Sequence, residues 1–223
     1  MLNGMKRGKA GAQATTPTRR QAGAPWQLLE AGRRELPHRQ ECSSFCGTLE
    51  SHLLPHLGQH DGKAVRVLDV GYGYLEELLA IGEFAGRTGL RMSKLVGLER
   101  NVASHVRAVR DMEREPHDGR LALVEGDAAE ARAVLGRESF DLVILRHPRA
   151  YAHSGHFEGM IEGLKEVAAP GALFFMTFYF DMELEFAKKA MEKAGFEILE
   201  AGWMGSRNSM SERSDYFLVS RAP

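Results

Sequence analysis

The chain has 223 residues, of which 43% are hydrophobic and 26% charged, and its formal net charge is -1. This length suits one domain with a short appendage, and the near-zero charge gives no global reason to expect nucleic acid or an anionic membrane as a partner. The two cysteines are too few for a disulfide scaffold and no apolar run is long enough to span a membrane, so we expect a protein of a reducing compartment, the cytoplasm.

The first 60 residues are expected to form a tail followed by a helical segment. Residues 1–25 contain five Lys and Arg and no acidic residue, and such a composition cannot bury enough apolar surface to offset the entropy of ordering. We expect a disordered basic tail, with an organelle transit peptide as the alternative. Residues 26–60 carry apolar side chains at helical spacing and predict an N-terminal helical cap, in which Pro37 separates two helices and Pro55 ends or kinks the second.

The helical segment also contains histidines and cysteines spaced four residues apart. Imidazoles and thiolates at this spacing on one helix can share a metal ion. However, Pro55 interrupts one of the two ladders, and neither is accompanied by a C-x2-C knuckle, so we expect buried free cysteine beside surface histidine and no metal site. The two ladders are His38, Cys42 and Cys46, and His52, His56 and His60.

From residue 65 onward short apolar runs alternate with helical stretches, which is typical of a parallel sheet with helices on both faces. The pattern predicts a doubly wound α/β domain over residues 61–223, and its last two apolar runs are joined by a polar loop. The expected strands are 65–70, 94–99, 121–125, 140–146, 172–179, 197–203 and 216–221. The expected helices are 75–85, 102–113, 128–135, 157–167 and 182–194.

A glycine turn closes the first expected strand, in the sequence VRVLDVGYGYLEE of residues 65–77. A strand, a turn at Gly71 and Gly73, and a helix form the nucleotide-cradling start of a doubly wound fold. A dinucleotide site would need a third glycine at the position of Glu76. Glu76 and Glu77 place negative charge where a pyrophosphate would sit, whereas a ligand with an ammonium and a sulfonium would be attracted. The turn therefore favours S-adenosylmethionine over a nicotinamide dinucleotide.

Carboxylates also follow the next strands. Ligands bind such sheets beyond the carboxyl ends of the strands. Glu99 ends the second strand and could accept hydrogen bonds from both ribose hydroxyls, and Asp127 follows the third strand, where an adenine amino group could donate to it. These carboxylates could instead cap helices or accept from neighbouring backbone N–H groups. Their occurrence at three successive strand ends, with Asp69 in the first, favours a cofactor site.

The order of VLDVGYG, VGLE, VEGDA, FDLVILRHP and LKEVAAPGALFFMTF resembles the class I S-adenosylmethionine-dependent methyltransferases over roughly residues 65–221. The resemblance implies a seven-stranded, mostly parallel, Rossmann-like sheet with an antiparallel last strand, preceded here by the helical segment. For the cofactor it implies that the methionine end is held by Asp69 and Gly71, the ribose by Glu99, and the adenine by Asp127 and Ala128.

The glycine turn departs from the family's commonest form, because the third glycine is replaced here by Leu75. Many members of the family tolerate this substitution. Arg100, beside Glu99, is a candidate contact that would also suit the 2′-phosphate of a nicotinamide cofactor. The remaining candidate cofactor contacts are Tyr72, Gly73, Glu76, Arg100 and Arg146.

His147 is the candidate catalytic base, because histidine titrates near neutral pH and this one directly follows the fourth strand. Alternatively it packs against Pro148 as a loop residue, or shares a metal with His153 and His156. The fourth strand lacks the Asn/Asp-Pro-Pro-aromatic motif of methyltransferases that modify base or glutamine nitrogens, so methylation of a nucleic-acid base is disfavoured. Further candidate substrate contacts are Tyr151, Tyr179, Asp181 and Arg207.

The sequence thus predicts a methyltransferase that acts on an oxygen or nitrogen of a small molecule, with a protein side chain as the second class of acceptor. We expect no nucleic-acid or membrane partner, and no feature predicts an oligomeric state. Two other classes stay open. One is a methyltransferase-like binding protein without acceptor chemistry, and the other is an NAD(P)-dependent oxidoreductase, against which Glu76 argues.

Overall fold

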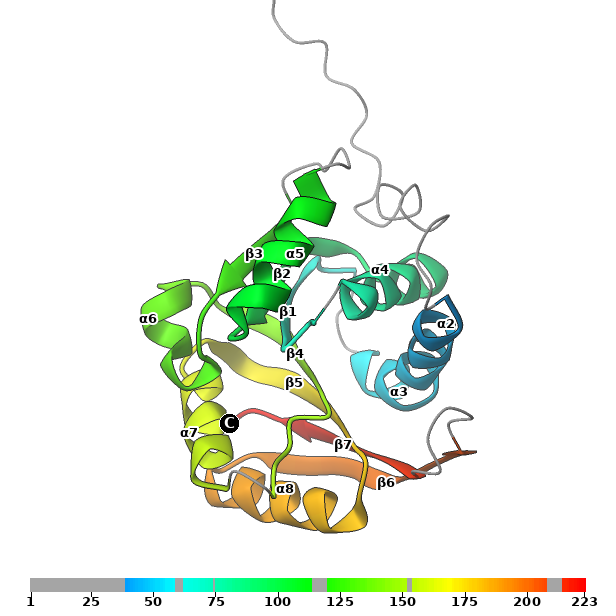
Figure 1. Ribbon diagram of the computed structural model, residues 1–223. Helices are drawn as coiled ribbons and strands as arrows, with labels where there is room; N and C mark the ends of the chain where they lie inside the picture. Colours follow the sequence, from blue (N-terminus) through cyan, green and yellow to red (C-terminus); the bar gives the residue numbers. More distant parts are fainter. Residues whose placement is uncertain (1–38, 59–61, 74, 114–119, 152–153, 208–213) are drawn as a thin grey trace, which may run out of the picture.

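The computed structural model describes residues 39–58, 62–73, 75–113, 120–151, 154–207 and 214–223 (Figure 1). Its centre is a seven-stranded sheet in the order β3-β2-β1-β4-β5-β7-β6. Strands β1 to β5 are parallel to one another, and β7 is antiparallel to both β5 and β6. The predicted doubly wound, mostly parallel sheet is confirmed. The strands are β1 (Val65–Val70), β2 (Met92–Glu99), β3 (Leu121–Glu125), β4 (Phe140–Arg146), β5 (Ala168–Phe178), β6 (Glu197–Arg207) and β7 (Ser214–Arg221).

The central strands are apolar on both sides, as a parallel sheet between two layers of helices requires. Val67 and Leu68 of β1 are both fully buried, yet they belong to separate core clusters on opposite faces of the sheet. Three strands start earlier than predicted, β2 at Met92, β5 at Ala168 and β7 at Ser214. The expected Ala-Pro-Gly turn therefore lies inside β5, where the register with β4 shifts and Gly171 has a φ of 75°.

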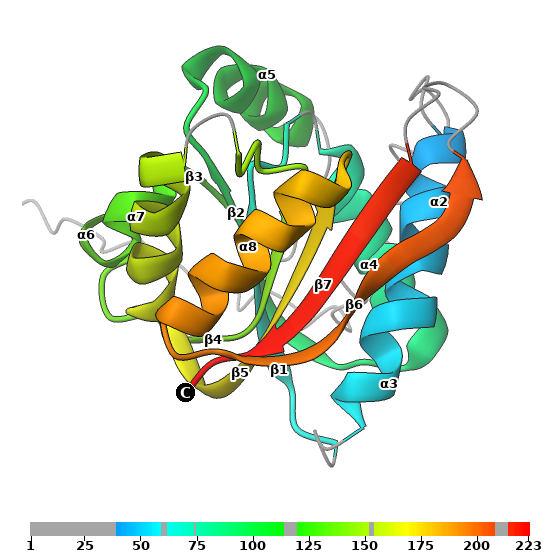
Figure 2. The ribbon, with the colours of Figure 1, turned by 90° about the horizontal axis from the view of Figure 1, so that it is seen from below.

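Helices cover both faces of the sheet, and they follow the predicted segments closely (Figures 1 and 2). The single helix expected over 128–135 is divided into a 3-10 turn and a short α-helix. One face carries α4 (Glu76–Thr88), α5 (Val102–Glu113) and the N-terminal helical segment, and the other carries η2 (Ala128–Glu130), α6 (Ala131–Leu135), α7 (Ser154–Lys165) and α8 (Asp181–Lys193).

The N-terminal segment is helical from residue 39 to 57, and it packs against α4 (Figure 2). It consists of α2 (Arg39–Thr48), a π-helical turn η1 (Leu49–Leu53) and α3 (Leu54–Leu57). The Leu54 N–H donates to Leu49 O, five residues back, so the helix widens just before Pro55. A wide turn accommodates a proline that would clash with the carbonyl four residues earlier in a regular helix. The predicted kink at Pro55 thus takes the form of a π-turn, and the predicted tail and Pro37 lie outside the described residues.

Two histidines fasten this helical segment to the edge of the sheet. His52 Nδ1 and His56 Nε2 lie 3.4 and 2.8 Å from the carboxylate of Glu200 in β6. The His52 ring also stacks on Phe217 of β7, with centroids 3.8 Å apart. The predicted ladder of histidines therefore contacts a carboxylate and an aromatic ring, while His60 lies outside the described residues. In the part of the chain that the structure describes, no helix is long and apolar enough to cross a membrane.

Candidate cofactor site

The turn after β1 has a backbone shape that glycine adopts at little cost. Gly71 and Gly73 have φ values of 79° and 61°, and the Gly71 N–H donates to Leu98 O of β2 at 2.7 Å. Leu75 also lies in the left-handed region, with φ 78°, although a β-carbon is strained there. Leu75, at the position of the third glycine of the turn, therefore adopts a backbone conformation that is typical of glycine. Glu76 opens α4 directly after it, but its side chain is not among those described, so its role stays a prediction.

The Tyr72 side chain is buried in the core and is not part of the pocket wall, so its predicted contact with the cofactor stays a prediction. The ring is 1% exposed and packs on Gly97 of β2, where an added Cβ would meet it at 2.5 Å. The hydroxyl lies 2.8 Å from Nδ1 of His105 in α5. Burial raises the pKa of the phenol, and the nearby Glu99 and Asp69 act in the same direction. Tyr72 therefore anchors the turn to β2 and α5.

Asp69 is a fully buried carboxyl in β1, and neither of its oxygens has a hydrogen-bond partner among the described residues. Burial raises its pKa well above the usual value; Glu77 adds to this rise and Arg146 opposes it. Arg146 Nη1 lies 3.5 Å from Glu77 Oε1, and both side chains are largely buried. Arg146 thus pairs with Glu77 and acts on Asp69 only at longer range, which leaves this part of the site with more carboxyl groups than guanidinium groups.

Glu99 ends β2 with its carboxylate held by the backbone. Gly73 N–H donates to Oε2 at 3.1 Å and Asn101 N–H donates to Oε1 at 2.7 Å. The side chain is 9% exposed and lies on the pocket wall. Each oxygen therefore has one backbone donor and keeps a further lone pair that a ligand hydroxyl could use. Glu99 therefore accepts from neighbouring backbone N–H groups, as one alternative predicted, and it also lines the pocket.

Asp127 begins η2 as its N-cap, accepting from Ala129 N–H at 2.9 Å. Around it lies a small polar cluster formed from three elements of the fold. Arg100 Nη1 approaches Asp127 Oδ2 at 3.5 Å and His156 Nε2 at 2.9 Å, and His156 Nε2 lies 3.7 Å from Asp127 Oδ1. Arg100 follows β2, Asp127 precedes η2, and His156 belongs to α7. The cluster therefore joins the end of β2, η2 and α7 at the pocket wall.

A pocket of about 560 Å³ opens at the carboxyl ends of β1, β2 and β4. Seven of the predicted site residues line it: Gly71, Glu99, Arg100, Asp127, Ala128, Arg146 and His147. Asp69 and Tyr72 are buried outside its wall, and Gly73 acts through its N–H bond to Glu99. Residues that were not predicted to contact the cofactor also line the wall, among them Asn101, Ser104, Arg149, His156, Phe157 and Met160.

The β4 end of the pocket is built differently from the β1 end. Arg146 ends β4 with its guanidinium 5.3 Å above the ring of Phe45 in α2, so the N-terminal helix packs on a pocket residue. His147 follows with φ 53°, and its ring stacks flat on Tyr179, with centroids 3.7 Å apart and planes at 4°. His147 therefore contacts an aromatic ring in addition to bordering Pro148, and its Nδ1 is buried.

The metal alternatives receive no support from the described residues, since no group of three His, Cys, Asp or Glu side chains in them is arranged to hold a metal ion. Cys46 is buried, and burial raises the pKa of its thiol to about 12. His153, His38 and the side chain of Cys42 lie outside the described part of the chain. Cys46 is therefore an inert core thiol.

No protein-family model and no curated protein sequence matches this chain. Solved structures do resemble it. The N-methyltransferase NodS of Bradyrhizobium japonicum WM9 superposes with a TM-score of 0.59 and 16% identity over 84% of this chain and 99% of its own. Magnesium protoporphyrin IX methyltransferase of Synechocystis PCC 6803, with bound S-adenosylmethionine, superposes with a TM-score of 0.58 and 15% identity over 95% of this chain and 87% of its own.

The glycopeptide N-methyltransferase MtfA, in complex with S-adenosylhomocysteine, gives a TM-score of 0.59 and 12% identity over 76% of this chain and 88% of its own. These identities are low, so the likeness concerns the arrangement of the backbone. The matched portions span 84%, 95% and 76% of this chain. The chain has the fold of the class I S-adenosylmethionine-dependent methyltransferases.

Proposed function

We propose that this chain is an S-adenosylmethionine-dependent methyltransferase that methylates an oxygen or nitrogen of a small molecule. The observation that carries the proposal is a pocket that starts at a glycine turn and has carboxylates on the β2 and β3 sides, in a sheet with this strand order. Similar structures include enzymes described as N-methyltransferases and as a porphyrin methyltransferase. These descriptions support a small-molecule acceptor, and a protein side chain is the second class.

The pocket residues fit the charges and polar groups of this cofactor. Asp69 is buried beside the pocket and neither of its oxygens has a described partner, so the ammonium of the methionine end could give it one, with loss of the carboxyl proton when the cofactor binds. Glu99 retains lone pairs for the ribose hydroxyls. Asp127 and Ala128 border the space expected for adenine. A pyrophosphate would meet these carboxyls instead, which argues against a dinucleotide.

The cofactor, when bound, supplies an electrophilic methyl group on a sulfonium. The chain must then hold the acceptor in line with that methyl group and exclude water. His147 borders the pocket, and its imidazole is a group that could take a proton from a hydroxyl or ammonium acceptor. The stack on Tyr179 fixes the plane of the imidazole. We assign His147 the role of general base.

Calorimetry tests the cofactor assignment directly. We expect S-adenosylhomocysteine to bind the full chain with micromolar or tighter affinity and NADH to give no measurable heat. Binding of NADH without binding of S-adenosylhomocysteine would refute the proposal. Binding of the nucleoside without methyl transfer to any acceptor would instead favour a ligand-binding protein with this fold.

Turnover tests the assignment of His147. Methyl transfer from labelled S-adenosylmethionine is measured over a panel of hydroxyl, amine and carboxylate acceptors. With an acceptor in hand, His147→Ala is expected to lower kcat about a hundredfold while the affinity for S-adenosylhomocysteine stays within about twofold. Unchanged kcat would remove His147 as the base.

A further inference from the structure

The charges around the pocket are divided between its two sides. The sides formed after β2 and β3 contribute Glu99 and Asp127, together with Arg100, which lies 3.5 Å from Asp127. The end of β4 and the loop after it contribute the run Arg146-His147-Pro148-Arg149, all four of which line the pocket. A cationic cofactor suits the acidic side, and this leaves the basic loop facing the space beyond the reacting methyl group.

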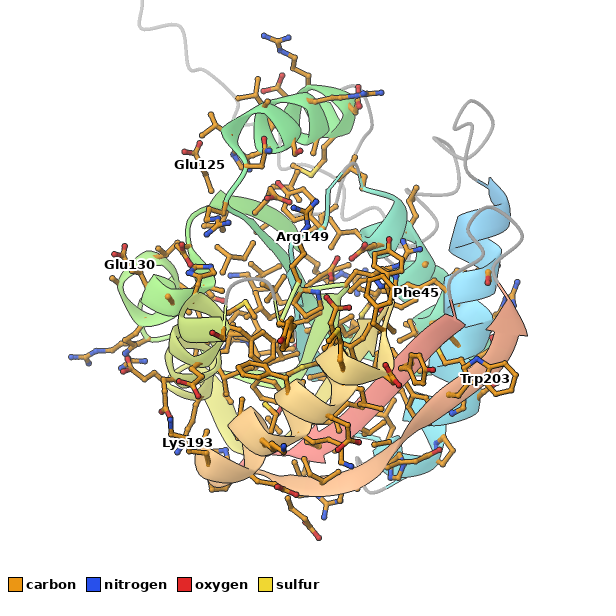
Figure 3. The ribbon with its side chains drawn as sticks, turned by 60° about the horizontal axis from the view of Figure 1, so that its bottom comes forward. Phe45, Glu125, Glu130, Arg149, Lys193 and Trp203 are labelled. Carbon is orange, nitrogen blue, oxygen red and sulfur yellow. The ribbon has the colours of Figure 1, made fainter. Side chains whose placement is uncertain are left out.

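The three arginines of the pocket differ in how far they are already neutralised. Arg100 lies near Asp127, and Arg146 lies near Glu77 and over the ring of Phe45. The Arg149 side chain is exposed and forms no ion pair with any residue that the structure describes. In Figure 3 Arg149 lies between α5, at the top of the view, and the sheet. Arg149 therefore offers a guanidinium to whatever enters the pocket.

The backbone of this loop is held in an unusual conformation. His147 and Arg149 have φ values of 53° and 24°, and Arg149 N–H donates to His147 O at 2.9 Å around Pro148. His147 N–H in turn donates to Thr177 O of β5. Positive φ at non-glycine residues costs free energy and occurs preferentially where a site needs a particular side-chain placement. The tight turn places the imidazole and the guanidinium on one pocket wall.

We propose that the methyl acceptor carries an anionic group, a carboxylate or a phosphate, and that Arg149 binds it. This inference rests on the proposed function, because it assumes that the cofactor occupies the acidic side. A guanidinium recognises both anions through paired N–H donors. The flat His147–Tyr179 stack, at the start of the same loop, suits an anion that is attached to a planar ring.

The test uses the full chain saturated with S-adenosylhomocysteine and three probes of similar size: benzoate, phenyl phosphate and benzyl alcohol. Dissociation constants are measured by NMR titration at low salt. We expect at least one of the two anions to bind about tenfold more tightly than the neutral alcohol, and the tighter one identifies the preferred anion. Arg149→Gln is expected to weaken anion binding about tenfold and to leave affinity for S-adenosylhomocysteine unchanged.

Arg132→Gln is the matched control, because Arg132 is an exposed arginine of α6 outside the pocket wall. It removes the same charge and should leave anion binding unchanged. Equal losses in the two variants would show a general surface effect and overturn the inference, as would equal binding of anions and alcohol. Loss of S-adenosylhomocysteine binding in Arg149→Gln alone would place Arg149 on the cofactor's own carboxylate and also overturn it. Failure of the wild-type chain to bind the nucleoside would refute the proposed function itself.

Discussion

The two halves of the pocket are held together in different ways. In the half formed by β1, β2 and β3, Glu99 and Asp127 are held in place by backbone N–H groups, and η2 packs against α7. In the half formed after β4, Arg149 has no ion pair with a described residue; positive φ values occur in the turns of both halves. The first half is preorganised by the fold, as a site for a fixed cofactor requires, whereas the second depends on a few side chains of one loop.

The largest effect on the first half is expected from Gly163→Ala in α7. An added Cβ would meet the backbone oxygens of Ala128 and Ala129 in η2, the latter at 2.6 Å. Backbone cannot yield as a side chain can, so we expect the free energy of unfolding to fall by about 3 kcal/mol. Denaturant unfolding gives this value, and calorimetry should show weaker binding of S-adenosylhomocysteine because the Asp127 wall is displaced.

Gly159→Ala is the control, because it lies one turn earlier in α7 and its added Cβ would find Ala129 Cβ at an ordinary 3.8 Å. We expect it to change stability by less than about 1 kcal/mol, with a gain in helix propensity. If both variants unfold with the same free energy, close packing of α7 on η2 does not support the cofactor half.

Glu99→Ala is the second test of the preorganised half. The carboxylate is expected to accept from the ribose hydroxyls, and it also fixes Gly73 and Asn101 through their N–H groups. Its loss should weaken binding of S-adenosylhomocysteine about a hundredfold, measured by calorimetry. Glu125→Ala is the control. Glu125 is the neighbour of Glu99 in the register of β2 and β3, but it is exposed and lies outside the pocket wall. Equal affinity of Glu99→Ala and wild type would refute the ribose assignment.

Periodicity predicted the fold well because strands buried on both faces produce apolar runs that differ from the helical stretches between them. The carboxylates of the first half could also be predicted from the sequence, since they lie at the ends of strands whose carboxyl ends meet at one edge of the sheet. The prediction was wrong locally where one sequence pattern is compatible with both a turn and an irregular strand. The Ala-Pro-Gly segment, expected to be a turn, is an irregular start of β5.

Side-chain direction was harder to predict than position. Tyr72 lies between two glycines of the turn, yet its ring enters the core because Gly97 leaves a space for it. Arg149 follows His147 by two residues, but the reversal of the backbone that brings both to the pocket depends on φ values that sequence does not reveal. Phe45 approaches Arg146 across a long sequence separation. Such contacts follow from tertiary packing rather than from local patterns.

Asp69→Asn tests the surplus of acid groups in the cofactor half. The folded state keeps the proton of Asp69 at pH values where the unfolded chain, with the usual pKa of 3.8, has released it. Stability therefore falls as pH rises from about 4 toward the raised pKa, by at most about 1.4 kcal/mol per pH unit. Asn cannot ionise, so the variant should show a smaller fall in the free energy of unfolding between pH 5 and pH 8.

The same variant should bind S-adenosylhomocysteine more weakly at pH 8, because the carboxylate that would face the ammonium is gone. One substitution thus has two separate readouts, a smaller fall in stability between pH 5 and pH 8 by unfolding and a loss of affinity by calorimetry. If the pH dependence of unfolding is unchanged in Asp69→Asn, the buried carboxyl does not titrate in this range. A smaller fall in stability with pH without loss of affinity would assign Asp69 a role in the fold without ligand alone.

Leu75 offers the smallest and most local test of the glycine turn. Its side chain is buried, so Leu75→Ala and Leu75→Gly both lose apolar contacts. In an ordinary helix Ala is more stable than Gly by about 1 kcal/mol. At φ 78° the order should reverse, with the Gly variant more stable than the Ala variant by about 1 kcal/mol, because only glycine adopts this conformation without strain. Denaturant unfolding of the two variants measures the difference directly. If the Ala variant is the more stable one, the left-handed turn before α4 is not present, and the backbone approach to the cofactor must differ from the one described.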